Sequence, residues 1–169
     1  MPILGTLSVG LLAGLVGSAA VHIFRLGWEA VINRDPRKGI FGFDNEADVN
    51  SIYLIYRCIS LDRPPKPRAA RIGLALHYVY GASLGALYAL TKPRVRGIAQ
   101  SSGVAPGALL WIGADELPIS LTGISDPFRR SIASHASALI AHVVFAVTVD
   151  QMVRGSAAKR CIKSGETYG

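Results

Sequence analysis

Long apolar stretches alternate with short blocks of charge, and this pattern restricts what the chain can fold into more than any other feature. The first stretch, Pro2–Val21, runs for 20 residues without a charged side chain. About 20 apolar residues in helical form are needed to cross the roughly 30 Å hydrocarbon core of a bilayer. Three further stretches of similar length begin near Ile72, Gly97 and Ile132. The pattern predicts an all-α integral membrane protein.

The charge of the chain is low in amount and lies mainly in the connections. Charged residues make up 17% of the sequence, whereas about 25% is usual for a soluble domain. The net charge of +7 would by itself favour nucleic acid as a partner. The basic clusters are short, however, and flank the apolar stretches, as at Lys92–Arg96 and Arg129–Arg130. We therefore expect contact with anionic lipid headgroups and no nucleic acid.

Four helices are expected to form one membrane domain over residues 1–169. We place the spans of this four-helix bundle at about 3–27, 72–91, 97–124 and 132–153. An open sheet is excluded at membrane depth because its edges would leave backbone groups without hydrogen bonds. The first stretch also resembles a signal peptide, with a cleavage site at Gly17–Ala20. It has no basic residue before it, so we favour a retained transmembrane helix.

The long first connection contains a segment, about 45–60, with an amphipathic pattern. Apolar residues recur there at spacings of three and one along one face of a helix: Val49, Ile52, Tyr53, Tyr56 and Ile59. One interpretation is a helix lying in the membrane interface. The other is a helix packed on the mouth of the bundle, which would bury the same residues.

Ionisable residues inside the spans are the main candidates for function, because they are costly in a membrane and tend to face a bundle interior or water. They lie on helix faces, in the half of the membrane nearest the first and third connections, except for His142, which is expected close to the midplane. We expect them to form a polar, water-accessible cluster that opens toward the long first connection. The members are His22, Arg25, Glu29, His77, Asp115, Glu116, His135 and His142.

Small residues share faces with this cluster. GxxxG spacings at Gly10–Gly14 and Gly81–Gly85 allow two helix backbones to approach closely. The glycines that we expect at helix contacts are Gly10, Gly14, Gly73, Gly81, Gly85, Gly103 and Gly107.

Several functions remain open at this stage. The chain has no Walker loop, GxGxxG, GxSxG or HExxH motif, so we do not expect an enzyme. Proton or ion homeostasis, or transport, follows from the ionisable cluster. A non-enzymatic accessory subunit of a photosynthetic or respiratory complex is the alternative. A metal site from His22, His77, His135 and Asp115, haem or chlorophyll ligation by His77 or His142, and a membrane enzyme are weaker interpretations. We predict no resident metal or cofactor.

Four sequence features occur in an order that resembles a known family. They are a first span ending in Arg25-x-x-x-Glu29, a second with His77-Tyr-x-Tyr-Gly81, the run Leu117–Pro127, and a fourth span with a central histidine before a basic tail. Together they resemble the YagU-like bacterial inner-membrane proteins, a largely uncharacterised family of which one member class is linked to acid tolerance.

The resemblance implies a topology with both termini cytoplasmic and the long connection periplasmic, in the bacterial cytoplasmic membrane. A count of basic residues, ten on the side of the long connection against seven on the other, favours the reverse. We adopt the family topology because long periplasmic loops tolerate Lys and Arg. Four spans are few for a solitary transporter, so the expected protein partners are further copies of the chain or other membrane subunits.

Overall fold

Three long helices dominate the architecture, and each is long and apolar enough to cross a membrane. The structure is a computed structural model that describes residues 3–32, 46–113 and 132–164. The long helices are α1 (Ile3–Ile32), α3 (Lys66–Thr91) and α7 (Ile132–Ser164). Shorter helices are α2 (Glu46–Cys58), α4 (Arg96–Gln100) and α5 (Val104–Trp111). Within the described residues the chain is all-helical and has no strand.

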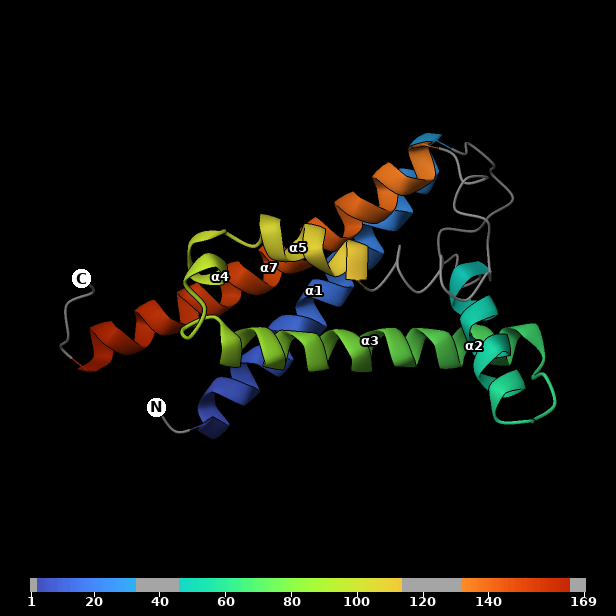
Figure 1. Cartoon of the computed structure of the whole chain (residues 1–169), viewed down its shortest axis with the longest axis horizontal. Helices are drawn as coiled ribbons and strands as arrows, with labels where there is room; N and C mark the ends of the chain where they lie inside the picture. Colours follow the sequence, from blue (N-terminus) through green and yellow to red (C-terminus); the bar gives the residue numbers. More distant parts are fainter. Residues whose placement is uncertain (1–2, 33–45, 114–131, 165–169) are drawn as a thin grey trace.

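Helix α1 lies at the centre and packs against both α3 and α7. It runs in the opposite direction to both of them, and α5 lies along α7 (Figure 1). The first residues of α1 and the last residues of α3 and α7 gather at one end of the molecule, whereas α2 lies at the other (Figure 1). The core between the three long helices contains Ala13, Val21, Phe145 and Val149.

The contact between α1 and α3 is made by glycine. A Cβ added at Gly10 would lie 2.6 Å from the Cα of Ala86, and one added at Gly85 would lie 2.6 Å from the Cα of Gly14. Such distances mean that the two backbones touch directly, the arrangement that small-xxx-small spacing permits. Gly81 faces Ser18 in the same contact, and Gly73 is buried on α3.

The third apolar stretch differs from the sequence prediction of one helix over 97–124. The chain turns at Ser102 and Gly103, whose φ angles of 50° and 84° are left-handed and end the helix there. Short α4 and α5 therefore replace the first part of the expected span, and residues 114–124 lie outside the described part. Among the described residues three helices are candidate spans, and the complete four-helix bundle stays a prediction.

Helix α5 nevertheless packs closely on α7. A Cβ at Gly103 would lie 2.6 Å from the carbonyl oxygen of Ala146, and one at Gly107 would lie 2.7 Å from the Cα of Val143. Contacts thus move backward along α7 as the chain moves forward along α5, so the two helices are antiparallel. The segment starts to return toward the end of the molecule where α7 begins (Figure 1).

Helix α2 packs across the start of α3. Ile52 is 2% exposed and contacts a cluster with Ala69 and Ala70, and Tyr53 and Tyr56 pack at its edge. Ile59, expected on the same buried face, is exposed. The left-handed Ser60 ends α2, and the Leu61 N–H donates to the Tyr56 carbonyl 2.9 Å away, which is a Schellman arrangement. The amphipathic face is therefore used for a contact within the protein.

We expect Ile52→Ala to release α2 from α3 while the long helices stay folded. Removing a fully buried isoleucine side chain costs about 2–5 kcal/mol, and this contact lies apart from the core of the three long helices. Hydrogen exchange of the α2 amides measures the effect and should accelerate. Ile55→Ala is the matched control, because Ile55 is 43% exposed and its loss should leave exchange unchanged. Equal protection in both variants would contradict the prediction.

Candidate polar pocket between the long helices

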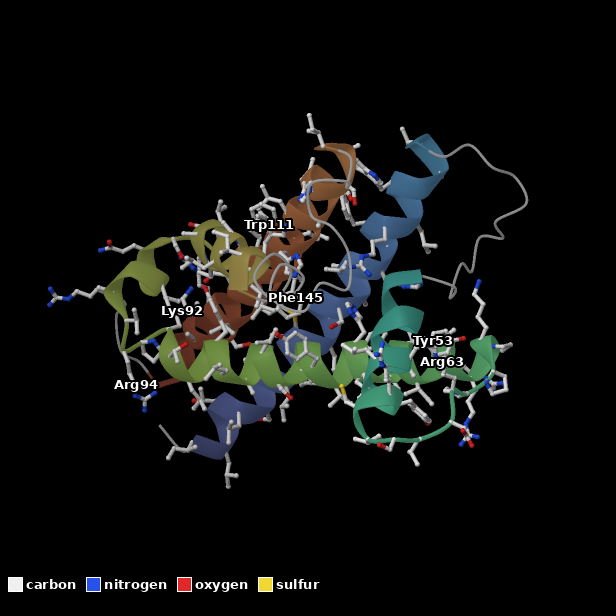
Figure 2. The ribbon with its side chains drawn as sticks, turned by 45° about the vertical axis from the view of Figure 1, so that its right-hand side comes forward. Tyr53, Arg63, Lys92, Arg94, Trp111 and Phe145 are labelled. Carbon is white, nitrogen blue, oxygen red and sulfur yellow. The ribbon has the colours of Figure 1, made fainter. Side chains whose placement is uncertain are left out.

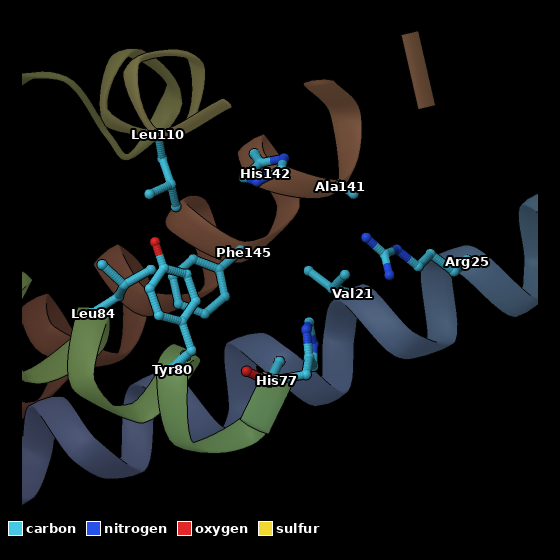
Figure 3. A pocket seen from close by; sticks show the side chains of 11 residues that line it. Val21, Arg25, His77, Tyr80, Leu84, Leu110, Ala141, His142 and Phe145 are labelled. Atoms are coloured by element: carbon cyan, nitrogen blue, oxygen red, sulfur yellow. The ribbon is translucent and has the colours of Figure 1, made fainter. Parts of the chain in front are cut away.

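A pocket of about 100 Å³ lies where α1, α3, α5 and α7 meet. Much of its wall is apolar, from Val21, Leu84, Leu110 and Phe145. The polar side chains in the wall are Ser18, Arg25, His77, Tyr80 and His142. Figure 3 shows Arg25 and His77 toward one side of the pocket and Tyr80, Leu84 and Leu110 toward the other.

Helical spacing brings these side chains to one place. Ser18, Val21 and Arg25 are three and four residues apart, so they occupy one face of α1. Helix α3 contributes His77, Tyr80, Gly81 and Leu84, again at spacings of three, one and three, and α7 contributes Ala141, His142 and Phe145. His77 and His142 lie near the middle of the candidate spans Lys66–Thr91 and Ile132–Ala158, whereas Arg25 lies near the end of Ile3–Trp28.

Ser18 is the most deeply buried polar residue of the pocket. Its side chain is fully buried, and its Oγ has no hydrogen-bond partner among the described residues. Gly81 makes room for the hydroxyl, since a Cβ at that position would overlap the Oγ. The Ser18 hydroxyl is therefore enclosed in the contact between α1 and α3 and is not open to the pocket.

His142 has a defined hydrogen-bond arrangement. Its Nδ1 lies 2.8 Å from the carbonyl oxygen of Ala138, one turn earlier in α7. A carbonyl oxygen only accepts, so neutral His142 carries its proton on Nδ1 and leaves Nε2 as an acceptor. Protonation at Nε2 would turn that atom into a donor and add a positive charge to the pocket. His77, across the pocket on α3, packs edge-on against Tyr78 with ring centres 5.7 Å apart.

The structure brings part of the predicted ionisable cluster together. Arg25, His77 and His142 line the pocket from three different helices. His22 and His135 are half-buried on α1 and α7 but are not among the lining residues. Glu29 lies one turn beyond Arg25 on α1, and Asp115 and Glu116 lie outside the described residues. In the part of the chain that is described, no three His, Cys, Asp or Glu side chains converge as a metal site.

A second polar cluster, around Asp150, was missed by the sequence interpretation. Asp150 is fully buried on α7. Its Oδ1 accepts a 2.6 Å hydrogen bond from the Tyr88 hydroxyl and pairs with the Lys92 ammonium, and its Oδ2 lies 2.7 Å from Nε of Arg154. We call Tyr88, Lys92, Asp150 and Arg154 the Asp150 cluster. It joins the last residues of α3 and the residue that follows them to the middle part of α7, on the side where Figure 2 places Lys92.

The electrostatics of the Asp150 cluster are unbalanced toward positive charge. Burial, and to a smaller extent the nearby Arg154 guanidinium, lowers the pKa of the Lys92 ammonium to about 8. Lys92 and Arg154 therefore share a single buried carboxylate, that of Asp150, as the counter-charge. The signal that could have found this cluster is the i, i+4 pair Asp150–Arg154 inside an apolar helix, which the sequence interpretation treated as the end of the last span.

Comparison of the chain with protein-family models, curated proteins and solved structures finds no significant match. The YagU-like resemblance therefore stays a prediction. The chemical argument rests on the pocket itself: one guanidinium, two imidazoles and the Tyr80 hydroxyl on an apolar wall. Such a wall offers hydrogen-bond donors and groups able to gain or lose a proton.

Proposed function

We propose that this protein is a small multi-pass protein of a bacterial cytoplasmic membrane. It would move an ion together with protons across that membrane through the polar pocket. The observation that carries the proposal is the convergence of Arg25, His77 and His142 on one pocket, from three helices that are candidate spans. Ionisable groups at membrane depth are costly and typically mark ion or proton pathways. Imidazoles change charge between about pH 5 and 8.

The apolar exterior supports a membrane position for this pocket. Large apolar side chains are exposed along the long helices, including Leu12 and Ile23 on α1, Leu76 and Val79 on α3, and Ile140 on α7. Water would disfavour such an exterior, whereas lipid tails or a second subunit would cover it. Both termini on the cytoplasmic side would agree with the position of the start of α1 and the end of α7 at one end of the molecule (Figure 1).

Flux through reconstituted vesicles tests this function. Full-length protein in proteoliposomes with a trapped pH-sensitive dye is expected to dissipate an imposed pH gradient. His77→Ala is expected to reduce the rate to that of protein-free vesicles, because the variant removes a titratable group from the pocket wall. Leu76→Ala is the matched control, since Leu76 is the adjacent position on α3 and is exposed.

A rate in wild-type vesicles no greater than in protein-free vesicles, across pH 5 to 8, would overturn the proposal. A stable complex with other membrane subunits, recovered from native membranes and accompanied by no flux, would instead support the accessory-subunit function.

A further inference from the structure

We infer that the pocket binds a small carboxylate, with Arg25 as the group that holds its anionic end. The inference rests on the proposed function in taking the pocket as the working site, and it names the ion. Donors are plentiful in the wall: the Arg25 guanidinium, the Tyr80 hydroxyl, and both imidazoles when protonated.

The guanidinium favours a carboxylate over a spherical anion. Its planar fork of N–H groups matches the two oxygens of a carboxylate, and such charge-assisted pairs are among the strong hydrogen bonds of proteins. Of the polar residues in the wall, Arg25 alone carries a permanent positive charge.

The remainder of the wall determines the rest of the ligand. Val21, Leu84, Leu110 and Phe145 give the pocket an apolar side that suits a short alkyl group (Figure 3). An engineered cavity of about 150 Å³ holds a benzene molecule, so the volume of about 100 Å³ here suits a ligand of about four to six heavy atoms. Acetate and propionate have this size. The carboxyl group of a fatty acid shares their chemistry but requires a path for its chain to leave the pocket.

Protonation of the pocket should strengthen carboxylate binding. The charged and titratable groups that face the ligand are Arg25 from α1, His77 and Tyr80 from α3, and His142 from α7, while α5 contributes Leu110. Because the Nδ1 of His142 is engaged by the Ala138 carbonyl, added protons enter at Nε2 and supply a new donor. Uptake of carboxylate and proton would then be linked.

Calorimetric titration of the full-length protein in nanodiscs tests the inference, with propionate as the probe. Propionate should bind, and propionamide, which has the same shape without the charge, should bind at least about tenfold more weakly. Arg25→Gln should lower propionate affinity at least about tenfold, whereas Arg57→Gln, an exposed residue on α2, should leave it unchanged. Arg25→Lys should recover part of the loss.

Oleate competing with propionate more strongly than acetate does would assign the site to lipid carboxyl groups instead.

One further variant tests the role of His142. His142→Asn keeps a donor toward Ala138 but has no Nε2 that could supply a donor to the carboxylate, so it should bind propionate more weakly than wild type does. Wild-type protein that binds propionate no better than propionamide, or Arg25→Gln that binds as wild type, would overturn the inference. Proton flux in vesicles without propionate binding would contradict this inference and leave the proposed function standing. Propionate binding without proton flux would contradict the proposed function and leave the carboxylate site standing.

Discussion

Asp150→Asn is expected to destabilise the protein by about 3–5 kcal/mol, the usual cost of removing one partner from a buried ion pair. Asparagine has nearly the same shape and can still accept the Tyr88 hydrogen bond, so the variant isolates the effect of charge. The Lys92 ammonium and the Arg154 guanidinium would be left facing each other without a carboxylate. The free energy of unfolding in detergent micelles, from chemical denaturation, measures the loss.

The pH dependence of this effect has a defined sign. The folded-state pKa of Lys92 is about 8, below its ordinary value of 10.5, so between these values the unfolded chain binds more protons than the folded one. Stability from this group therefore rises as the pH rises through that window. Removal of the carboxylate lowers the pKa of Lys92 further, so the folded variant releases this proton at a lower pH than the folded wild type does. We therefore expect the defect of Asp150→Asn to shrink as the pH rises toward 8 and to stay constant above it. The double variant Asp150→Asn/Lys92→Met should lack this recovery, and an equal recovery in both would contradict the assignment to Lys92.

Gly14→Val is the second substitution with a large expected effect. A Cβ at this position would overlap the Gly81 carbonyl and lie 2.7 Å from the Cα of Ala82, so α1 and α3 would have to move apart. Overpacking costs about 1–3 kcal/mol when side chains can yield. Here the obstacle is backbone, so we expect the upper end of that range or loss of folded protein. The melting temperature and the yield of monodisperse protein in detergent measure it.

Gly27→Val provides the matched comparison on the same helix. No atom lies within 4 Å of a Cβ added at Gly27, so this variant changes helix propensity without crowding a neighbour. It should be nearly neutral. Equal destabilisation by the two substitutions would mean that the α1–α3 contact is not what Gly14 provides.

The helices were largely predictable because hydropathy and periodicity reflect forces that act along the chain. Spans expected at 3–27, 72–91 and 132–153 correspond to α1, α3 and α7, which extend further into polar flanks, and the segment expected at 45–60 corresponds to α2. Hydropathy, however, does not indicate where the backbone leaves the helical conformation. The span predicted from Gly97 is interrupted by a left-handed turn, and the Ser101-Ser102-Gly103 run was the sequence signal for that interruption.

The pocket was predictable in part. Pattern reasoning selected Arg25, His77 and His142, because ionisable residues are rare in spans and tend to face inward. It also selected His22, which follows the pocket residue Ser18 by four positions. Each step of four residues passes a full turn by about 40°, and in the structure Val21 lines the pocket where His22 was expected. Which helices are neighbours, and at what depth they cross, depends on glycine contacts between distant segments.

The Asp150 cluster could not be assembled from the sequence for a similar reason. Tyr88 and Lys92 lie about 60 residues from Asp150, and a membrane boundary drawn near residue 153 makes Asp150 and Arg154 look like ordinary flanking charges. Only the fold, in which α3 and α7 run in the same direction (Figure 1), brings the end of α3 next to the middle part of α7.

Helix α2 and the last turns of α7 lie at opposite ends of the molecule (Figure 1), and each contains one cysteine. Labelling of these cysteines can therefore show how the protein is oriented in a membrane. Cys58, the final residue of α2, is a free and exposed thiol, and Cys161 belongs to the last turns of α7. The two cysteines thus belong to helix segments at opposite ends of the molecule (Figure 1). Variants that retain only one of them, treated in sealed vesicles with a maleimide that does not cross lipid, would report which end faces outward. No added tag or fusion partner would be needed.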